Sequence, residues 1–125
     1  MRAILDAGAL IALDRGDRRV GAMLRVLHQQ ATPIVTSGGV VAQVWRDGAR
    51  QANLARALMG VDVRPVDATS GRAIGELLAR TATADIVDAH VALLAAPGDR
   101  MLTSDADDIA TLLQAGGVDA TIITV

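Results

Sequence analysis

The 125-residue sequence contains no cysteine, lysine, phenylalanine or tyrosine, and it has a single tryptophan. Without cysteine the chain forms no disulfide bond, no thiolate metal site and no thiol nucleophile. Without lysine it has no Schiff base and no P-loop lysine, so any long basic side chain that contacts a phosphate is an arginine. These absences leave carboxylates, amides, hydroxyls, two histidines and the arginines for any chemistry.

The charged residues are almost all of two kinds. All 12 basic residues are arginine, and of the 14 acidic residues only Glu76 is not aspartate. The net charge of −2 gives no strong overall attraction for nucleic acid. Codon bias in a GC-rich genome explains the preference for arginine, alanine, glycine and valine, so composition by itself indicates no function.

Hydrophobic residues make up 51% of the chain, but no apolar run approaches the roughly 18 residues that a membrane span requires. Asp6 interrupts the apolar N-terminal segment, and no signal-peptide cleavage pattern follows it. We therefore expect one domain over residues 1–125, in the cytoplasm and without a membrane partner.

Short apolar or β-branched runs alternate with segments of helical periodicity along the whole chain. The runs predict strands at residues 2–5, 33–36, 61–66, 100–103 and 120–125, the third at a sheet edge because it contains Pro65. Helices are predicted at 7–13, 18–30, 40–48, 49–59, 69–80, 85–96 and 105–114. This alternation predicts an α/β fold, a three-layer α/β/α domain whose parallel sheet has about five short strands.

Aspartates stand where predicted strands or loops lead into helices. Asp6 and Asp105 follow two apolar strands, and Asp88 lies in the first turn of an apolar helix that begins near Asp85. Asp is also a preferred N-cap, so capping alone is an alternative explanation for each residue, and for Asp85 and Asp108 it is a sufficient one. In a parallel sheet, however, Asp6, Asp88 and Asp105 approach one edge, where their mutual repulsion calls for a cation.

Carboxylate oxygens without cysteine or an adjacent histidine favour Mg²⁺ or Mn²⁺ over Zn²⁺. Such hard divalent cations in carboxylate clefts serve phosphoryl transfer, where they activate water and neutralise charge on the phosphodiester oxygens. The residues therefore suggest a site for one or two Mg²⁺ or Mn²⁺ ions that hydrolyses phosphodiester bonds.

Three segments together resemble the PIN-domain nucleases. These are residues 4–13 (ILDAGALIAL), 85–92 (DIVDAHVA) and 102–109 (LTSDADDI), which occur in the family's order and at suitable spacing. At this length the chain is most similar to the toxin of a VapBC-type toxin–antitoxin pair. The resemblance implies a metal-dependent endoribonuclease, and by position Asp6, Asp88 and Asp105 match the family's acidic site residues. Asp108 matches an additional acid of many members, and Asp85 is a candidate outer member of the metal site.

The sequence departs from the family pattern at one position. The family usually has a glutamate on the helix after the second strand, and Gln43 stands there instead. An amide oxygen can ligate Mg²⁺ or hold a water, but it carries no negative charge and is a poor general base. Either the site binds metal weakly, or Asp85 or Asp108 makes up the charge, or the domain is a catalytically weak or inactive binding module for RNA or a partner protein.

Other residues are weaker candidates. Gln43, Arg46 and Arg50 have the spacing of one helix face, which would place the two arginines where they contact an RNA phosphate or form surface ion pairs. Ser104 is a further candidate for a phosphate contact. Two α/β enzyme classes fit less well: haloacid-dehalogenase phosphatases need a second aspartate where Gly8 stands, and response-regulator receivers need a lysine.

The resemblance also implies partners: an RNA substrate, a small cognate antitoxin (VapB-like) and a second copy of the chain in a homodimer. The apolar helix face with Met23 and Leu27, or the one with Leu54, Leu58 and Met59, is a candidate for either protein contact, although such faces in a small domain more often belong to the core.

Overall fold

The computed structural model describes all residues, Met1–Val125. Five strands form its sheet: β1 (Ala3–Leu5), β2 (Ile34–Ser37), β3 (Asp62–Arg64), β4 (Arg100–Thr103) and β5 (Thr121–Thr124). The helices are α1 (Ala7–Asp14), α2 (Arg18–Gln29), α3 (Gly38–Val44), the short 3₁₀ helix η1 (Gly48–Arg50), α4 (Ala52–Leu58), α5 (Ala68–Thr81), α6 (Ile86–Leu94) and α7 (Ala106–Ala115). No helix is long and apolar enough to cross a membrane.

All strand pairs are parallel, and the strand order is β3-β2-β1-β4-β5. From the central β1 the chain moves to β2 and β3 on one side, then returns to β4 and β5 on the other side. The order therefore reverses next to β1, and in open α/β sheets ligands bind in the crevice at the carboxyl ends of the strands at such a point. Asp6 directly follows β1, and Ser104 directly follows β4.

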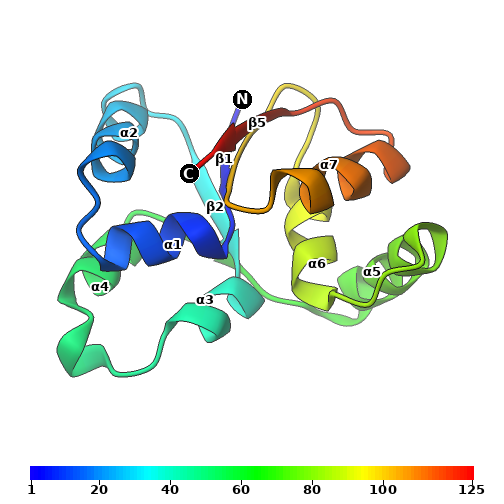
Figure 1. Cartoon of the computed structure of the whole chain (residues 1–125), viewed down its shortest axis with the longest axis horizontal. Helices are drawn as coiled ribbons and strands as arrows, with labels where there is room; N and C mark the ends of the chain where they lie inside the picture. Colours follow the sequence, from blue (N-terminus) through cyan, green and yellow to red (C-terminus); the bar gives the residue numbers. More distant parts are fainter.

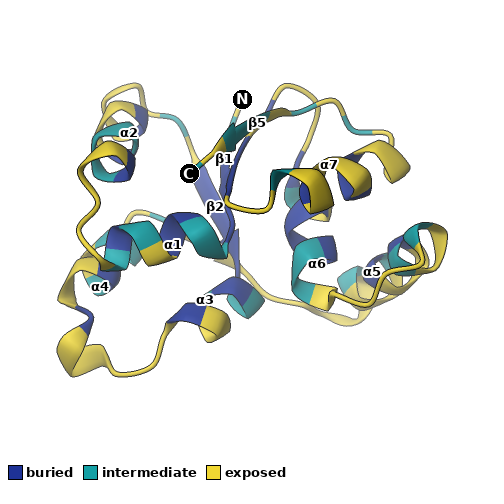
Figure 2. Ribbon diagram, in the orientation of Figure 1, coloured by how far each residue is buried: buried dark blue, intermediate teal, exposed yellow.

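Helices cover both faces of the sheet, which confirms the predicted three-layer α/β/α architecture. Helices α1 to α4 lie on one side of the sheet and α5 to α7 on the other (Figure 1). The inner strands are apolar because both of their faces are covered, and every residue of β1 and β2 is buried (Figure 2). The predicted edge strand is confirmed as β3, but it has only three residues, all exposed.

Buried polar contacts hold together the amino-terminal end of the sheet. Asp99, 2% exposed, lies just before β4 and accepts hydrogen bonds from the backbone N–H of Arg2 (2.8 Å) and of Ala96 (2.8 Å). The Arg2 guanidinium forms an ion pair with the same carboxylate at 3.1 Å. Burial by itself raises the pKa of Asp99, but the hydrogen bonds from Ala96 and Arg2 and the Arg2 charge outweigh it, and the pKa lies below its ordinary value.

The structure differs from the prediction in the segment after α3. The sequence predicted one helix at 40–48 and a second at 49–59, with no gap between them. Helix α3 ends at Val44, and α4 begins only at Ala52. The cause is Gln51, a buried side chain whose Oε1 accepts hydrogen bonds from the backbone N–H of Arg46 (2.7 Å) and Asp47 (3.0 Å). Its Nε2 donates to the carbonyl oxygen of Val44 at 2.9 Å, so one amide replaces the backbone partners that a continuous helix would supply.

Candidate active site

Asp6 is fixed at the carboxyl end of the central strand. Its backbone N–H donates to the carbonyl of Leu102 at 3.0 Å, which continues the β1–β4 ladder by one residue. The side chain is 2% exposed, and its Oδ1 accepts from the N–H of Ala7 at 2.8 Å, which makes Asp6 the N-cap of α1. Its Oδ2 accepts from the hydroxyl of Thr103 at 2.8 Å. Both oxygens are thus oriented by the fold.

Thr103, the last residue of β4, connects Asp6 to Asp105. The hydroxyl that donates to Asp6 also accepts from the backbone N–H of Asp105 at 2.9 Å. Asp105 precedes α7, yet its carboxylate makes no capping hydrogen bond and is exposed. The capping explanation therefore fails for Asp105, and its carboxylate is available to a ligand.

Asp88 enters the same region from the other face of the sheet, in the first turn of α6. Asp85 is the N-cap of this helix, since its Oδ1 accepts from the N–H of Asp88 at 2.9 Å. The pKa of Asp88 is raised to about 7, first by burial and then by the negative charges of Asp85, Asp6, Asp105 and Asp108. The charges of Asp6 and Asp105 thus reach Asp88 from two other segments of the chain.

Two adjoining surface hollows contain four of these acids, whereas the buried Asp6 lines neither. One, of about 280 Å³, is lined by Asp85, Asp88 and Asp108 with two threonines. The other, of about 340 Å³, is lined by Ser104, Asp105 and Asp108 with Asp107. Because Asp108 borders both, the hollows form one continuous acidic surface at the carboxyl edge.

The donors present suit a hard divalent cation in type, because all of them are carboxylate or hydroxyl oxygens. Burial and four neighbouring carboxylates raise the pKa of Asp88, and no arginine lines either acidic hollow. However, no three acidic or histidine side chains stand close enough together to hold a metal ion in their present rotamers. Metal binding therefore requires rotation of the exposed Asp105 and the half-buried Asp88 toward the fixed Asp6.

The structure does not bring Gln43, Arg46 and Arg50 onto one helix face, so that prediction is wrong. Gln43 is exposed near the end of α3 and lines neither acidic hollow. Arg46 lies beyond the helix end and donates to the carbonyl oxygens of Ala42 and Trp45, each at 2.8 Å. Arg50 pairs with Asp47 at 3.6 Å on the surface, which is the ion-pair alternative.

A buried pair lies beneath the edge next to α3. His90 of α6 is 2% exposed, and its Nδ1 is 2.6 Å from the hydroxyl oxygen of Ser37 at the end of β2. That oxygen also accepts from the N–H of Gly39 at 3.0 Å. Burial lowers the pKa of His90, and Asp67 offsets this only in part, so the ring is neutral at pH 7. The pair links α6 to β2 and holds the helix that carries Asp88.

Two features of the edge have no clear signal in the sequence. Thr103 is explained equally well as a cap or as a water-ordering group, and its bridging role depends on the pairing of β1 with β4. Gly8 lies so close to Ser104 that an added Cβ would stand 2.4 Å from its Oγ and 2.9 Å from its backbone nitrogen. A glycine in a helix predicts a close approach in general but does not identify its partner.

Comparison with solved structures identifies the fold. The chain is similar to one in the crystal structure of VapBC2 from Rickettsia felis, which is bound to a DNA fragment from its promoter. The TM-score is 0.71, with 14% sequence identity over 98% of this chain and 99% of that one. The fold is PIN-like. No family model and no curated protein sequence matches the chain.

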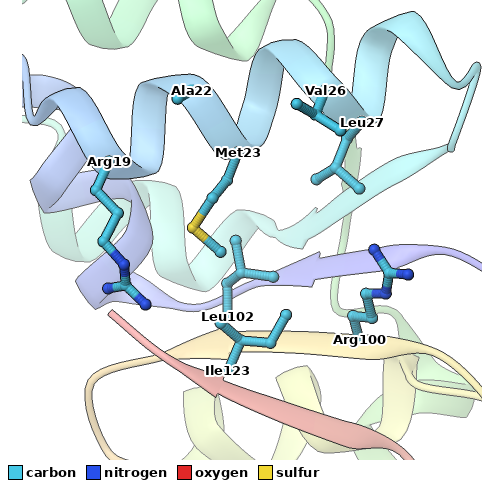
Figure 3. A pocket seen from close by; sticks show the side chains of 8 residues that line it. All are labelled: Arg19, Ala22, Met23, Val26, Leu27, Arg100, Leu102 and Ile123. Atoms are coloured by element: carbon cyan, nitrogen blue, oxygen red, sulfur yellow. The ribbon is translucent and has the colours of Figure 1, made fainter.

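The PIN-like domain also has an apolar groove away from the acidic edge. It measures about 410 Å³ and is lined mainly by Met23, Val26 and Leu27 of α2 and by Leu102 and Ile123 of the sheet. Figure 3 shows the Met23 and Leu27 side chains pointing from the helix toward the sheet, with Arg19 and Arg100 at opposite ends. Of the two predicted apolar faces, this one forms a groove, whereas Leu54 is fully buried in the core.

Proposed function

We propose that the chain is a metal-dependent endoribonuclease, the toxin of a VapBC-type toxin–antitoxin pair. One observation carries the proposal: Asp88 is half-buried in a surface hollow, and its pKa is raised to about 7, first by burial and then by the negative charges of Asp85, Asp6, Asp105 and Asp108. Perturbed carboxyl groups in a surface cleft are typical of functional sites. The PIN-like fold and its likeness to a chain of VapBC2 support the same conclusion.

In this proposal Asp6, Asp88 and Asp105 hold one or two Mg²⁺ or Mn²⁺ ions, with Asp108 and Asp85 adding negative charge. A bound metal would supply a water nucleophile and would neutralise charge on the phosphodiester. Asp6 is preorganised because Thr103 and the N–H of Ala7 fix both of its oxygens. Asp88 would have to give up its proton to ligate a cation, which would link metal affinity to pH near neutrality.

The direct test is cleavage of a structured RNA by purified protein in Mn²⁺, compared between the wild type and Asp88→Asn. Asp119→Asn is the matched control, because Asp119 is an exposed aspartate in the loop before β5. We expect Asp88→Asn and Asp6→Asn to abolish cleavage, EDTA to do the same, and Asp119→Asn to cleave as the wild type does. Equal cleavage by wild type and Asp88→Asn would refute the assignment.

A second function is favoured by a specific observation. No three acids are positioned to hold a metal in their present rotamers, and Gln43 replaces the glutamate of the resembled family. A PIN-fold module that binds RNA or a protein without cutting is the alternative. Calorimetric titration with Mg²⁺ or Mn²⁺ separates the two, because no binding at millimolar metal would favour the non-catalytic module.

We further propose that the apolar groove at α2 receives an apolar helix of the antitoxin, and that the protein acts in the cytoplasm as a homodimer. The groove walls are apolar, and Arg19 and Arg100 at its ends suit carboxylates that flank such a helix. Met23→Asp should abolish copurification with the product of a neighbouring short reading frame. Met59 follows α4 and is 87% exposed, and Met59→Asp should leave copurification unchanged. If Met59→Asp abolished copurification and Met23→Asp did not, the antitoxin would contact α4 instead.

A further inference from the structure

A second polar hollow lies at the opposite end of α1 from Asp6. It measures about 470 Å³ and is formed between the start of α2 and α4. Its lining includes three arginines, Arg18, Arg25 and Arg56, together with Asn53, and only one hydrophobic residue, Leu13. A site of this kind is unsuited to an apolar partner and suited to an anion.

The donors around the hollow are arranged by contacts with one another and with two glycines. The Nη2 of Arg56 donates to the Oδ1 of Asn53 at 2.6 Å, which leaves the Asn53 amide N–H groups free as donors. The amide nitrogen would be 3.5 Å from a Cβ at Gly16, and the Nη1 of Arg25 would be 3.8 Å from one at Gly21. Gly16 and Gly21 thus lie next to these donors in the lining of the hollow.

The hollow carries excess positive charge. None of its three arginines has a carboxylate within ion-pair distance, although the chain contains more acidic than basic residues. Asp17 is the one acid in the lining, and its Oδ1 is engaged by the N–H of Val20 at 2.9 Å as the cap of α2. Three guanidinium groups against one carboxylate leave a net attraction for a dianion or for a chain of phosphates.

A third hollow lies between this site and the acidic edge and shares one lining residue with each, Asp17 and Ser104. It measures about 440 Å³ and runs along α1, with Gly8 and Ser104 at one end and Arg15 and Asp17 at the other. Ser104 also borders the hollow of Asp105 and Asp108, and Asp17 also borders the arginine hollow. The eight residues of α1 span about 12 Å, so the two sites are within reach of one strand of nucleic acid.

We propose that the hollow of Arg18, Arg25 and Arg56 binds a backbone phosphate of the same single-stranded RNA that is cut at the acidic edge. This inference rests on the proposed function. The arginines hold the strand by its backbone and supply the attraction that the acidic edge lacks. An acidic segment of a protein partner could use the same charges, but the polar lining and the path to Asp105 favour RNA.

The test measures binding, so it does not depend on cleavage. Affinity for a fluorescent single-stranded RNA is followed by anisotropy in EDTA over a range of salt concentrations, for the wild type and for Arg25→Gln/Arg56→Gln. The double variant should bind about 10-fold more weakly, and the slope of log K against log salt should fall by about 0.7, the change expected for one lost phosphate contact. Arg72→Gln/Arg80→Gln, on α5, is the matched control and should bind as the wild type does.

The lysine variant Arg25→Lys/Arg56→Lys separates charge from folding, because it keeps the positive charges and should keep most of the salt slope. Unchanged affinity and slope in the glutamine variant would overturn the inference even if the wild type cleaves RNA. If Arg25→Gln/Arg56→Gln lost antitoxin binding but still bound RNA as the wild type does, the inference would also be overturned. The hollow would then be assigned to an acidic segment of a protein. Arginine-dependent RNA binding by a protein that does not cleave would refute the proposed function alone.

Discussion

The hydroxyl of Thr103 donates a hydrogen bond of 2.8 Å to the carboxylate of Asp6, and both side chains are buried. Thr103→Val removes this donor at nearly constant volume. We expect Mn²⁺ affinity and RNA cleavage to fall by about 10- to 100-fold, as is typical when a group that orients a metal ligand is lost. Thr103→Ser restores the hydroxyl and should recover most of the activity, and equal loss in both variants would contradict the orienting role.

Asp88 gives the metal-free protein an unusual dependence on pH. Its pKa is about 7 in the folded state against 3.8 ordinarily, so the folded protein retains a proton that the unfolded chain has lost. Stability should therefore fall as pH rises from about 4 to 7. Because Asp88 is partly solvated, we expect a loss of about 1–2 kcal/mol, less than the full shift would give.

Urea unfolding at several pH values in EDTA measures this effect. Asp88→Asn should remove most of the fall in the free energy of unfolding between pH 4 and 7. In the wild type, Mn²⁺ should stabilise the protein at pH 7 and so reverse this fall. The same pH dependence of stability in the wild type and in Asp88→Asn would show that the pKa of Asp88 is not raised in the folded protein.

The ion pair of Arg2 and Asp99 predicts a large effect far from the acidic edge. Asp99→Ala removes the buried carboxylate that accepts from the N–H groups of Arg2 and Ala96 and pairs with the half-buried Arg2 guanidinium, which should cost about 2–4 kcal/mol. Asp62→Ala breaks the exposed 2.7 Å pair with Arg64 and should cost less than about 1 kcal/mol. Urea unfolding at pH 7 compares them, and equal losses would contradict the difference in burial.

Gly8 and Gly75 make a matched pair of helix glycines. Gly8→Ala places a methyl group against Ser104, whose backbone cannot move without displacing Asp105, so stability should fall by about 1–3 kcal/mol and cleavage should drop. Gly75→Ala, with no atom within 4 Å of the new Cβ, should stabilise α5 by about 0.5–1 kcal/mol. Thermal unfolding distinguishes them, and a stabilised Gly8→Ala would contradict the close approach.

Strand and helix positions were predictable where periodicity is local and uninterrupted, as in α5 and α6, and the parallel sheet followed from their alternation with strands. The sequence also predicted that Asp6, Asp88 and Asp105 approach one edge, because parallel strands share their carboxyl ends. It did not predict the end of α3, since that depends on the Gln51 side chain seven residues farther along. The roles of Thr103 and Arg56 likewise depend on tertiary contacts rather than on local pattern.

The central claim is that the acidic edge binds a divalent cation, and calorimetric titration with Mn²⁺ near pH 7 tests it most directly. We expect millimolar or tighter binding to the wild type, with a heat that changes with the buffer because Asp88 releases its proton. Asp88→Asn and Asp105→Asn should lose this binding, and Asp119→Asn should retain it. Absence of binding by the wild type at millimolar Mn²⁺, or equal binding by all four proteins, would contradict the account.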